Sequence, residues 1–119
     1  MRVRIENFSE KELACPCCGK NKVTDKALIM LQTLRYLCDF PLKISSGFRC
    51  EKYNKQIKGA RSSKHMSGVA FDIKRLSTKN VALLTHHALN LGFKGAGIYD
   101  QHVHLDIRPC PALWVGTSK

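Results

Sequence analysis

Two long segments of the chain carry apolar residues at the three- and four-residue spacing of an amphipathic helix. The first predicts a helix over residues 25–39 with Thr24 as its N-cap. Its apolar positions are Ala27, Leu28, Leu31, Leu34, Leu37 and Cys38. The second predicts a helix over residues 79–91, with Thr78 as the expected N-cap and Gly92 as the expected end. Each helix therefore has one face suited to a hydrophobic core.

Shorter runs predict the remaining elements. They are a strand at 42–45, a short helix at 50–57, a strand at 69–73, and a final strand that begins at residue 98 or 102 and ends at 107. Residues 95–97 are expected to turn the chain, and residues 109–111 are expected to end regular structure. Helices mixed with non-repeating strands indicate an α+β fold with a small, mainly antiparallel sheet and flanking helices. The length of 119 residues suits one domain.

The charge balance is strongly basic, with 20 Lys and Arg residues against nine Asp and Glu, a formal net charge of +11. Such a charge favours a polyanionic partner: a nucleic acid, an anionic membrane face or an anionic cell wall. The basic residues are dispersed, without stacking aromatic residues between them, which disfavours nucleic acid. No apolar run reaches the roughly 20 residues that span a bilayer, and residues 1–6 are charged. We therefore expect no membrane span and no signal peptide, with synthesis in a cytoplasm.

Six cysteines are many for this length. The segment Cys15-Pro16-Cys17-Cys18-Gly19 resembles one half of a zinc knuckle, and Cys50 and Cys110 are candidates to complete it. A second CxxC pair, which is usual in knuckles, is not in the sequence. Three interpretations stay open for Cys15, Cys18, Cys50 and Cys110: a structural metal, disulfides, or free buried thiols.

The polar faces of two predicted strands carry the candidate chemistry. Side chains alternate along a strand, so His102, His104 and Asp106 share the face opposite the apolar residues of the last strand. If the strand at 69–73 is its neighbour, Asp72 and His104 meet at side-chain range. A bend before that strand can bring His65 to the same point. Two imidazoles and a carboxylate suit zinc with one open position, where a bound water becomes a nucleophile near neutral pH.

Each of these residues also has a plainer interpretation. A histidine in a loop is usually solvated, an HxH pair on a strand is often surface decoration, and an aspartate on a polar face often accepts from a neighbouring backbone group. His86 and His87 lie within the second predicted helix, where solvated or packed histidines are expected rather than ligands. Spacing alone therefore leaves the metal site as one of two interpretations.

Three blocks of sequence together resemble a known family. They are Ser45-Ser46-Gly47-Phe48-Arg49, Ser63-x-His65-x-x-Gly68-x-Ala70-x-Asp72 and Val103-His104-Leu105-Asp106. In this order and spacing they resemble the zinc D-Ala-D-Ala carboxypeptidase family, which includes peptidoglycan carboxypeptidases, phage endolysins that cleave stem peptides, and the related fold of hedgehog signalling domains. The chain looks most like the compact, phage-type members, with a Cys-Cys-Gly segment and a late tryptophan, Trp114. The resemblance implies a hedgehog/DD-peptidase-like fold and a single metallopeptidase-like domain over residues 1–119.

The resemblance also implies roles for individual residues. His65, Asp72 and His104 match the zinc ligands of the family. Arg49 matches the arginine that steadies the oxyanion at the attacked carbonyl, a task that suits a guanidinium fork. Ser63 matches a residue that helps to hold substrate, and a loop hydroxyl bonded to the backbone is its alternative interpretation.

One position departs from the family pattern. Larger members carry a carboxylate three residues before the last histidine ligand as general base, and here that position is Gln101, which cannot take a proton. Asp100 and His102 flank it, and either can act as the base or acid; we favour His102. Asp106 is a candidate to orient an imidazole.

The resemblance therefore implies a zinc metallopeptidase, a peptidoglycan hydrolase that cleaves stem peptides. Both a D,D-carboxypeptidase and an endopeptidase, such as one that cuts L-Ala-D-Glu, fit the sequence. The expected partner is peptidoglycan or a muropeptide, the expected state is a monomer, and the expected place of action is the cell wall after phage-type release. Two alternatives stay open. Gln101 favours a non-catalytic zinc-containing binding module of the same fold, while the charge and the Cys15–Cys18 cluster favour a basic nucleic-acid-binding protein.

Overall fold

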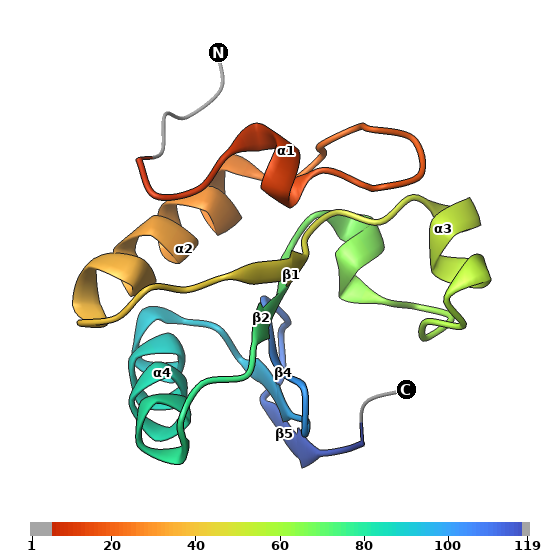
Figure 1. The fold of residues 1–119 in the computed structure, drawn as a ribbon. Helices are drawn as coiled ribbons and strands as arrows, with labels where there is room; N and C mark the ends of the chain where they lie inside the picture. Colours follow the sequence, from red (N-terminus) through yellow and green to blue (C-terminus); the bar gives the residue numbers. More distant parts are fainter. Residues whose placement is uncertain (1–5, 118–119) are drawn as a thin grey trace.

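The computed structural model describes residues 6–117 (Figure 1). Residues 1–5, which hold most of the charged N-terminal segment noted above, lie outside the described part. In chain order the elements are α1 (Glu10–Leu13), α2 (Asp25–Leu37), β1 (Ile44–Ser46), α3 (Glu51–Gln56), the 3₁₀-helix η1 (Lys64–Ser67), β2 (Ala70–Lys74), α4 (Thr78–Leu91), β3 (Gly95–Ile98), β4 (His102–Asp106) and β5 (Ala112–Val115). None of the helices in residues 6–117 has both the length and the apolar character needed to cross a bilayer.

The strands form one mixed sheet in the order β1-β2-β4-β3-β5. All neighbouring pairs are antiparallel except β3 and β5, which are parallel. The predicted α+β fold, with a mainly antiparallel sheet and flanking helices, is therefore confirmed. Strands β2 and β4 are neighbours in a register that pairs Asp72 with His104 and Ala70 with Asp106.

The core lies between the sheet and the two long helices, α2 and α4, which Figure 1 shows on the same side of the strands. Alternate residues of the two central strands are fully buried there: Phe71, Ile73, Val103 and Leu105. The predicted apolar faces of the helices cover them with Leu28, Leu31, Leu34, Leu84 and Ala88. Because side chains alternate along a strand, Asp72 and His104 are directed to the other side of the sheet, where α3 and η1 lie.

The helix ends follow local hydrogen-bonding groups. Thr24 caps α2 as predicted, since its hydroxyl accepts a backbone amide of the first turn. The predicted cap of α4 was one residue too late: Ser77, not Thr78, accepts the first-turn amide. Gly92 ends α4 as predicted, in the left-handed conformation with a φ of 113°. The helix α1 was not predicted, and β1, α3 and β2 match the predicted short elements with ends shifted by one or two residues.

Two predictions for the last third of the chain were wrong. Gly95 and Gly97 do not form a turn but lie in β3, where they allow close approach of side chains from neighbouring strands. A Cβ on Gly95 would lie 2.1 Å from the Asp106 carboxylate, and one on Gly97 would lie 2.4 Å from the Trp114 ring. Regular structure also does not end at residues 109–111, because β5 follows and pairs with β3.

Candidate metal centre

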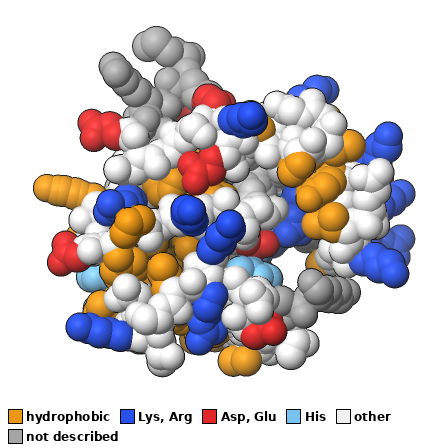
Figure 2. Space-filling model, in the orientation of Figure 1, with side chains coloured by type: hydrophobic (Ala, Val, Ile, Leu, Met, Phe, Trp, Pro, Cys, Tyr) orange, Lys and Arg blue, Asp and Glu red, His pale blue; other side chains and the backbone are white. Residues whose placement is uncertain are grey.

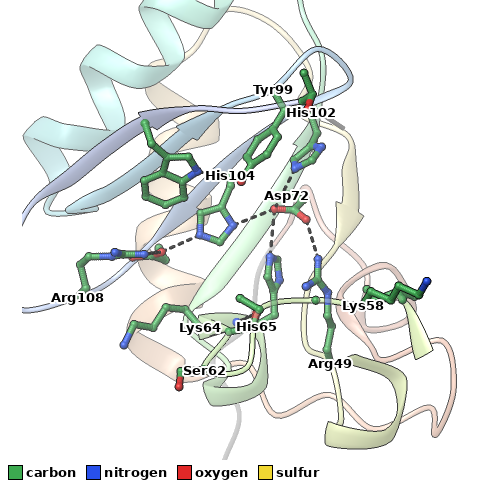
Figure 3. A pocket seen from close by; sticks show the side chains of 17 residues that line it. Arg49, Lys58, Ser62, Lys64, His65, Asp72, Tyr99, His102, His104 and Arg108 are labelled. Atoms are coloured by element: carbon green, nitrogen blue, oxygen red, sulfur yellow. Dashed lines mark hydrogen bonds and ion pairs between the residues drawn. The ribbon is translucent and has the colours of Figure 1, made fainter. Parts of the chain in front are cut away.

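The polar face of β2 and β4 forms the floor of a pocket of about 410 Å³. Its walls come from the loop after α3, from η1, from the turn before β4 and from the chain around β5 (Figure 3). Six of the predicted site residues line it together: Arg49, Ser63, His65, Asp72, His102 and His104. The pocket therefore gathers side chains that lie far apart in the sequence.

His65 reaches the pocket from η1. The Ser63 hydroxyl accepts the His65 backbone amide at 3.3 Å, and Gly68 ends η1 in the left-handed conformation with a φ of 71°. A Cβ on Gly68 would lie 2.0 Å from the Lys22 carbonyl oxygen, so glycine permits the predicted bend. His65 is 1% exposed, and its Nδ1 lies 2.7 Å from the Gly47 carbonyl oxygen. Because a carbonyl only accepts, Nδ1 carries a proton, which leaves Nε2 as the nitrogen that can face a metal.

His104 is oriented in the same manner from β4. Its Nε2 lies 2.7 Å from Oδ2 of Asp106, which is fully buried. Burial raises the pKa of Asp106, but hydrogen bonds from Arg108 and His104 outweigh burial and bring it to about 2. Asp106 is therefore an acceptor at neutral pH, and His104 donates to it from Nε2, which leaves Nδ1 as the nitrogen that can face a metal.

Asp72 faces both of these nitrogens. Its Oδ1 lies 3.1 Å from His65 Nε2 and 3.0 Å from His104 Nδ1, while its Oδ2 accepts from Arg49 at 2.9 Å. Burial raises the pKa of Asp72, but the neighbouring His104 and His65 outweigh burial and hold it well below its usual range. Asp72 is therefore a carboxylate at neutral pH, and three electron-rich atoms converge on one point.

Such a convergence needs positive charge at its centre. Without a cation, His65 and His104 would each have to carry a second proton in order to donate to Asp72. Their ring centroids are 5.1 Å apart, so two imidazolium ions would stand beside each other and beside the Arg49 guanidinium. One divalent cation could bind all three atoms while both imidazoles are neutral. The three atoms lie within 4.8 Å of one another, as the ligands of one ion do. The residues thus fit a metal ion.

His102 lies next to this donor set. Its Nε2 is 3.9 Å from Asp72 Oδ1, and its ring stacks on Tyr99 with centroids 4.4 Å apart. Burial lowers the pKa of His102, and the attraction of Asp72 does not cancel this, so the ring is neutral at pH 7 and able to accept a proton. The other predicted base, Asp100, is exposed in the turn before β4 and is not part of the pocket lining; Gln101 is exposed as well.

Arg49 is held in one orientation beside Asp72. Its Nε donates to the Ser46 hydroxyl at 3.0 Å, and Nη1 donates to Asn54 Oδ1 at 3.3 Å. Asn54 is 3% exposed and donates in turn to the Ala60 carbonyl at 2.8 Å. Sequence reasoning missed Asn54, because an asparagine within a short polar helix gives no signal of burial.

The other side of the pocket is formed by Tyr99, Arg108 and Trp114. Of these three, only Trp114 was noted from the sequence. The Trp114 indole donates to the Tyr99 hydroxyl at 2.9 Å. The Arg108 guanidinium lies over the Trp114 ring, 5.1 Å from its centroid, and Nε donates to Asp106 at 2.7 Å. The signal that could have found Arg108 is its position two residues after Asp106, at strand spacing.

The candidate cysteines divide into a cluster and an outlier. The sulfur atoms of Cys15, Cys18 and Cys50 lie within 4.8 Å of one another, outside the pocket lining. Cys110 is exposed and does not belong to this cluster, and all six cysteines are free thiols in the structure. The grouping expected from the sequence is therefore present for three of its four members.

Donor chemistry of this kind, with access to solvent through a pocket, is that of metal-dependent hydrolases. The chain belongs to the peptidase M15 family, whose family model matches residues 6–106. The matched segment contains all three converging residues, His65, Asp72 and His104. Peptidases of this family are zinc-dependent, which agrees with the donor set. A search of curated proteins gives no significant match.

Proposed function

We propose that this protein is a zinc peptidase that cleaves the stem peptides of peptidoglycan at the cell wall, in the manner of the compact phage-type members of the family. The observation that carries the proposal is the convergence of His65 Nε2, His104 Nδ1 and Asp72 Oδ1 on one point. The opposite nitrogen of each imidazole is held by a hydrogen bond, to the Gly47 carbonyl for His65 and to Asp106 for His104. The resemblance to D,D-carboxypeptidases and to L-Ala-D-Glu endopeptidases supports both cleavage positions.

His65, Asp72 and His104 would hold the zinc. A bound zinc supplies Lewis acidity toward water and toward a peptide carbonyl. The Gly47 carbonyl and Asp106 keep the two imidazoles in the required tautomers, since each accepts the proton on the far nitrogen. Arg49 keeps Oδ2 of Asp72 occupied, so that Oδ1 is the oxygen presented to the metal.

Two further residues supply proton transfer and charge stabilisation. His102 is neutral and lies beside the donor set, so it is placed to take a proton from water and return it to the leaving amine. A guanidinium has five N–H donors, and the contacts of Arg49 with Ser46, Asn54 and Asp72 use three of them. The same guanidinium can therefore stabilise the oxyanion of the attacked carbonyl.

The charges of the pocket support an anionic peptide as substrate. Apart from Asp72 and Asp106, the charged side chains of the lining are basic: Arg49, Lys58, Lys64 and Arg108. Figure 3 shows Lys58 and Lys64 on opposite sides of the His65 ring, at the rim of the site. Figure 2 shows Lys and Arg side chains gathered over the part of the molecule that carries α3 and the loop after it. Carboxylate-bearing stem peptides of an anionic wall match this distribution.

Digestion of purified peptidoglycan tests the proposal. Wild-type protein loaded with zinc is expected to release muropeptide fragments whose masses identify the cut bond. His104→Ala is expected to release none, while His86→Ala, which changes an exposed histidine on α4, is expected to match wild type. No fragments from the wild-type protein, or equal release by His104→Ala, would overturn the proposal.

A second candidate function is a non-catalytic zinc-containing binding module of the same fold. Gln101 favours it, because this position carries the general base in larger relatives and glutamine takes no proton. The same digestion separates the two functions: a zinc-loaded protein that sediments with the wall but cuts no bond would be a binding module. The basic nucleic-acid-binding alternative predicts instead a salt-dependent mobility shift with DNA and no retention on purified wall.

A further inference from the structure

The cysteine cluster lies where the loop after α1 meets the start of α3. Cys15 belongs to that loop, and Cys50 is the N-cap of α3. Their sulfur atoms are 3.6 Å apart, and the Cys18 sulfur lies within 4.8 Å of both. Four zinc–thiolate bonds of about 2.3 Å at tetrahedral angles place neighbouring sulfurs about 3.8 Å apart. A disulfide needs about 2.05 Å and joins only two of the three.

The loop that carries the first cysteines is tightly folded. The Cys15 amide donates to the Lys20 carbonyl at 2.8 Å, and the Gly19 amide donates to the Cys15 carbonyl at 2.8 Å. Gly19 has a φ of 73°, the left-handed conformation that closes such a turn. The segment Cys15-Pro16-Cys17-Cys18-Gly19 is thus a tight turn that places the Cys15 and Cys18 sulfurs beside that of Cys50.

Backbone amides point at the sulfurs of this cluster. The Cys50 amide donates to the Cys15 sulfur at 3.4 Å, and the Tyr53 amide donates to the Cys50 sulfur at 3.4 Å. Donors directed at sulfur stabilise the thiolate, which is the form that binds metal.

We propose that Cys15, Cys18 and Cys50 bind a structural zinc ion, with Cys17 as the fourth ligand. The Cys17 thiol neighbours that of Cys50 and is exposed, so a side-chain rotation can bring it to the ion. Thiolate ligands select zinc among the common divalent ions of cells. Cys38 and Cys110 stay outside the site, since neither lies with the cluster.

Zinc at this position would tie together two segments that frame the pocket. The Phe48 amide donates to the Leu13 carbonyl at 2.9 Å, so the loop after α1 runs beside the segment before α3. That segment contains Gly47, which orients His65, and Arg49, which binds Asp72. The cysteine zinc would thus stabilise the wall of the pocket without touching its contents.

Cobalt substitution tests the proposal independently of the peptidase site. Cobalt(II) bound by thiolates gives intense near-ultraviolet sulfur-to-cobalt charge-transfer bands, which histidine and carboxylate ligands do not give. We expect these bands in the reduced wild-type protein, with a loss of about a quarter of their intensity in Cys17→Ser and a larger loss in Cys18→Ser. Both changes are at exposed positions, so the fold is expected to persist. Cys110→Ser, an exposed cysteine outside the cluster, is the matched control and should keep the full bands.

Metal content gives the second readout. In a His104→Ala background, where the histidine site is disabled, one equivalent of zinc is expected to remain and to be lost in Cys18→Ser. Absence of the charge-transfer bands in wild type, or unchanged zinc in Cys18→Ser, would overturn the site. Full bands in Cys17→Ser would overturn Cys17 as the fourth ligand. Recovery of a Cys15–Cys50 disulfide from protein purified without reductant and free of zinc would also overturn the proposal.

Discussion

Asp106→Asn tests how much the orientation of His104 contributes to zinc binding. Asp106 is fully buried, accepts from His104 Nε2 at 2.7 Å, and accepts two hydrogen bonds from Arg108. An asparagine has the same shape but carries an NH₂ group on one side. In place of Oδ2, this NH₂ faces both the His104 ring and Nη2 of Arg108; in place of Oδ1, it faces Nε of Arg108. The variant therefore loses the charge and at least one of the matched contacts.

The magnitude follows from the contacts. A hydrogen bond to a charged group contributes about 1.5–3 kcal/mol, and a neutral one about 0.5–1.5 kcal/mol. The difference of about 1–1.5 kcal/mol corresponds to roughly a tenfold loss of zinc affinity. When the NH₂ group faces the His104 ring, loss of the fixed tautomer adds to this, and changes of such orienting residues typically cost 10–100-fold in metal affinity. We expect a fall within that range.

The assay is competition for zinc between the metal-free protein and a fluorescent chelator, over a range of pH. Burial lowers the pKa of His104, but Asp106 and Asp72 outweigh burial and raise it. Protons compete with zinc at His104 below this pKa. Removing the Asp106 charge lowers the pKa, so the acid limb of zinc binding should move to lower pH while the maximal affinity falls. Asp39→Asn, an exposed aspartate outside the pocket lining, is the control.

Two outcomes would refute this reasoning. Unchanged zinc affinity in Asp106→Asn would show that the contact with His104 does not orient a ligand. An acid limb that moves to higher pH would indicate general loss of stability rather than loss of the carboxylate beside His104. A thermal unfolding curve of the metal-free variant separates these causes.

Three more predictions concern the pocket and its framework. Arg49→Lys should lose most peptidase activity with zinc and fold retained, because one ammonium cannot replace three directed contacts; near-normal kcat would reject the assigned role. His102→Ala should lower kcat by ~100-fold with zinc retained, and Asp100→Asn should change it little; the reverse ranking would make Asp100 the base. Gly68→Ala should lower the melting temperature by at least about 5 °C, since a left-handed alanine costs roughly 1–2 kcal/mol and its Cβ meets backbone. Gly19→Ala has a similar φ but no neighbour within 4 Å, so an equal loss in both would remove the steric argument.

Strand alternation predicted much of the site before the structure was known. It placed Asp72 and His104 on the polar faces of two strands, and the register of β2 and β4 makes them direct partners. His65 could be added because a glycine follows it where the chain must bend. The positions of these three residues depend on local spacing and on one pairing between neighbouring strands. A sequence pattern can predict both.

Other features depend on contacts that no local pattern encodes. The tautomer of His65 is set by the Gly47 carbonyl, 18 residues away in the sequence. The glycines of β3 were wrongly predicted to form a turn. They are required because the Asp106 and Trp114 side chains of neighbouring strands occupy the space that a Cβ would take. The parallel strand β5 was missed for the same reason, since its partner lies in β3 and a proline-rich segment precedes it.

The central claim is that one zinc ion lies among His65, Asp72 and His104. The most direct measurement is crystallography of the zinc-loaded protein at wavelengths on both sides of the zinc absorption edge. The account predicts an anomalous difference peak about 2.0–2.2 Å from His65 Nε2, His104 Nδ1 and Asp72 Oδ1. Ordered side chains in the present arrangement with no such peak among these three atoms would contradict it.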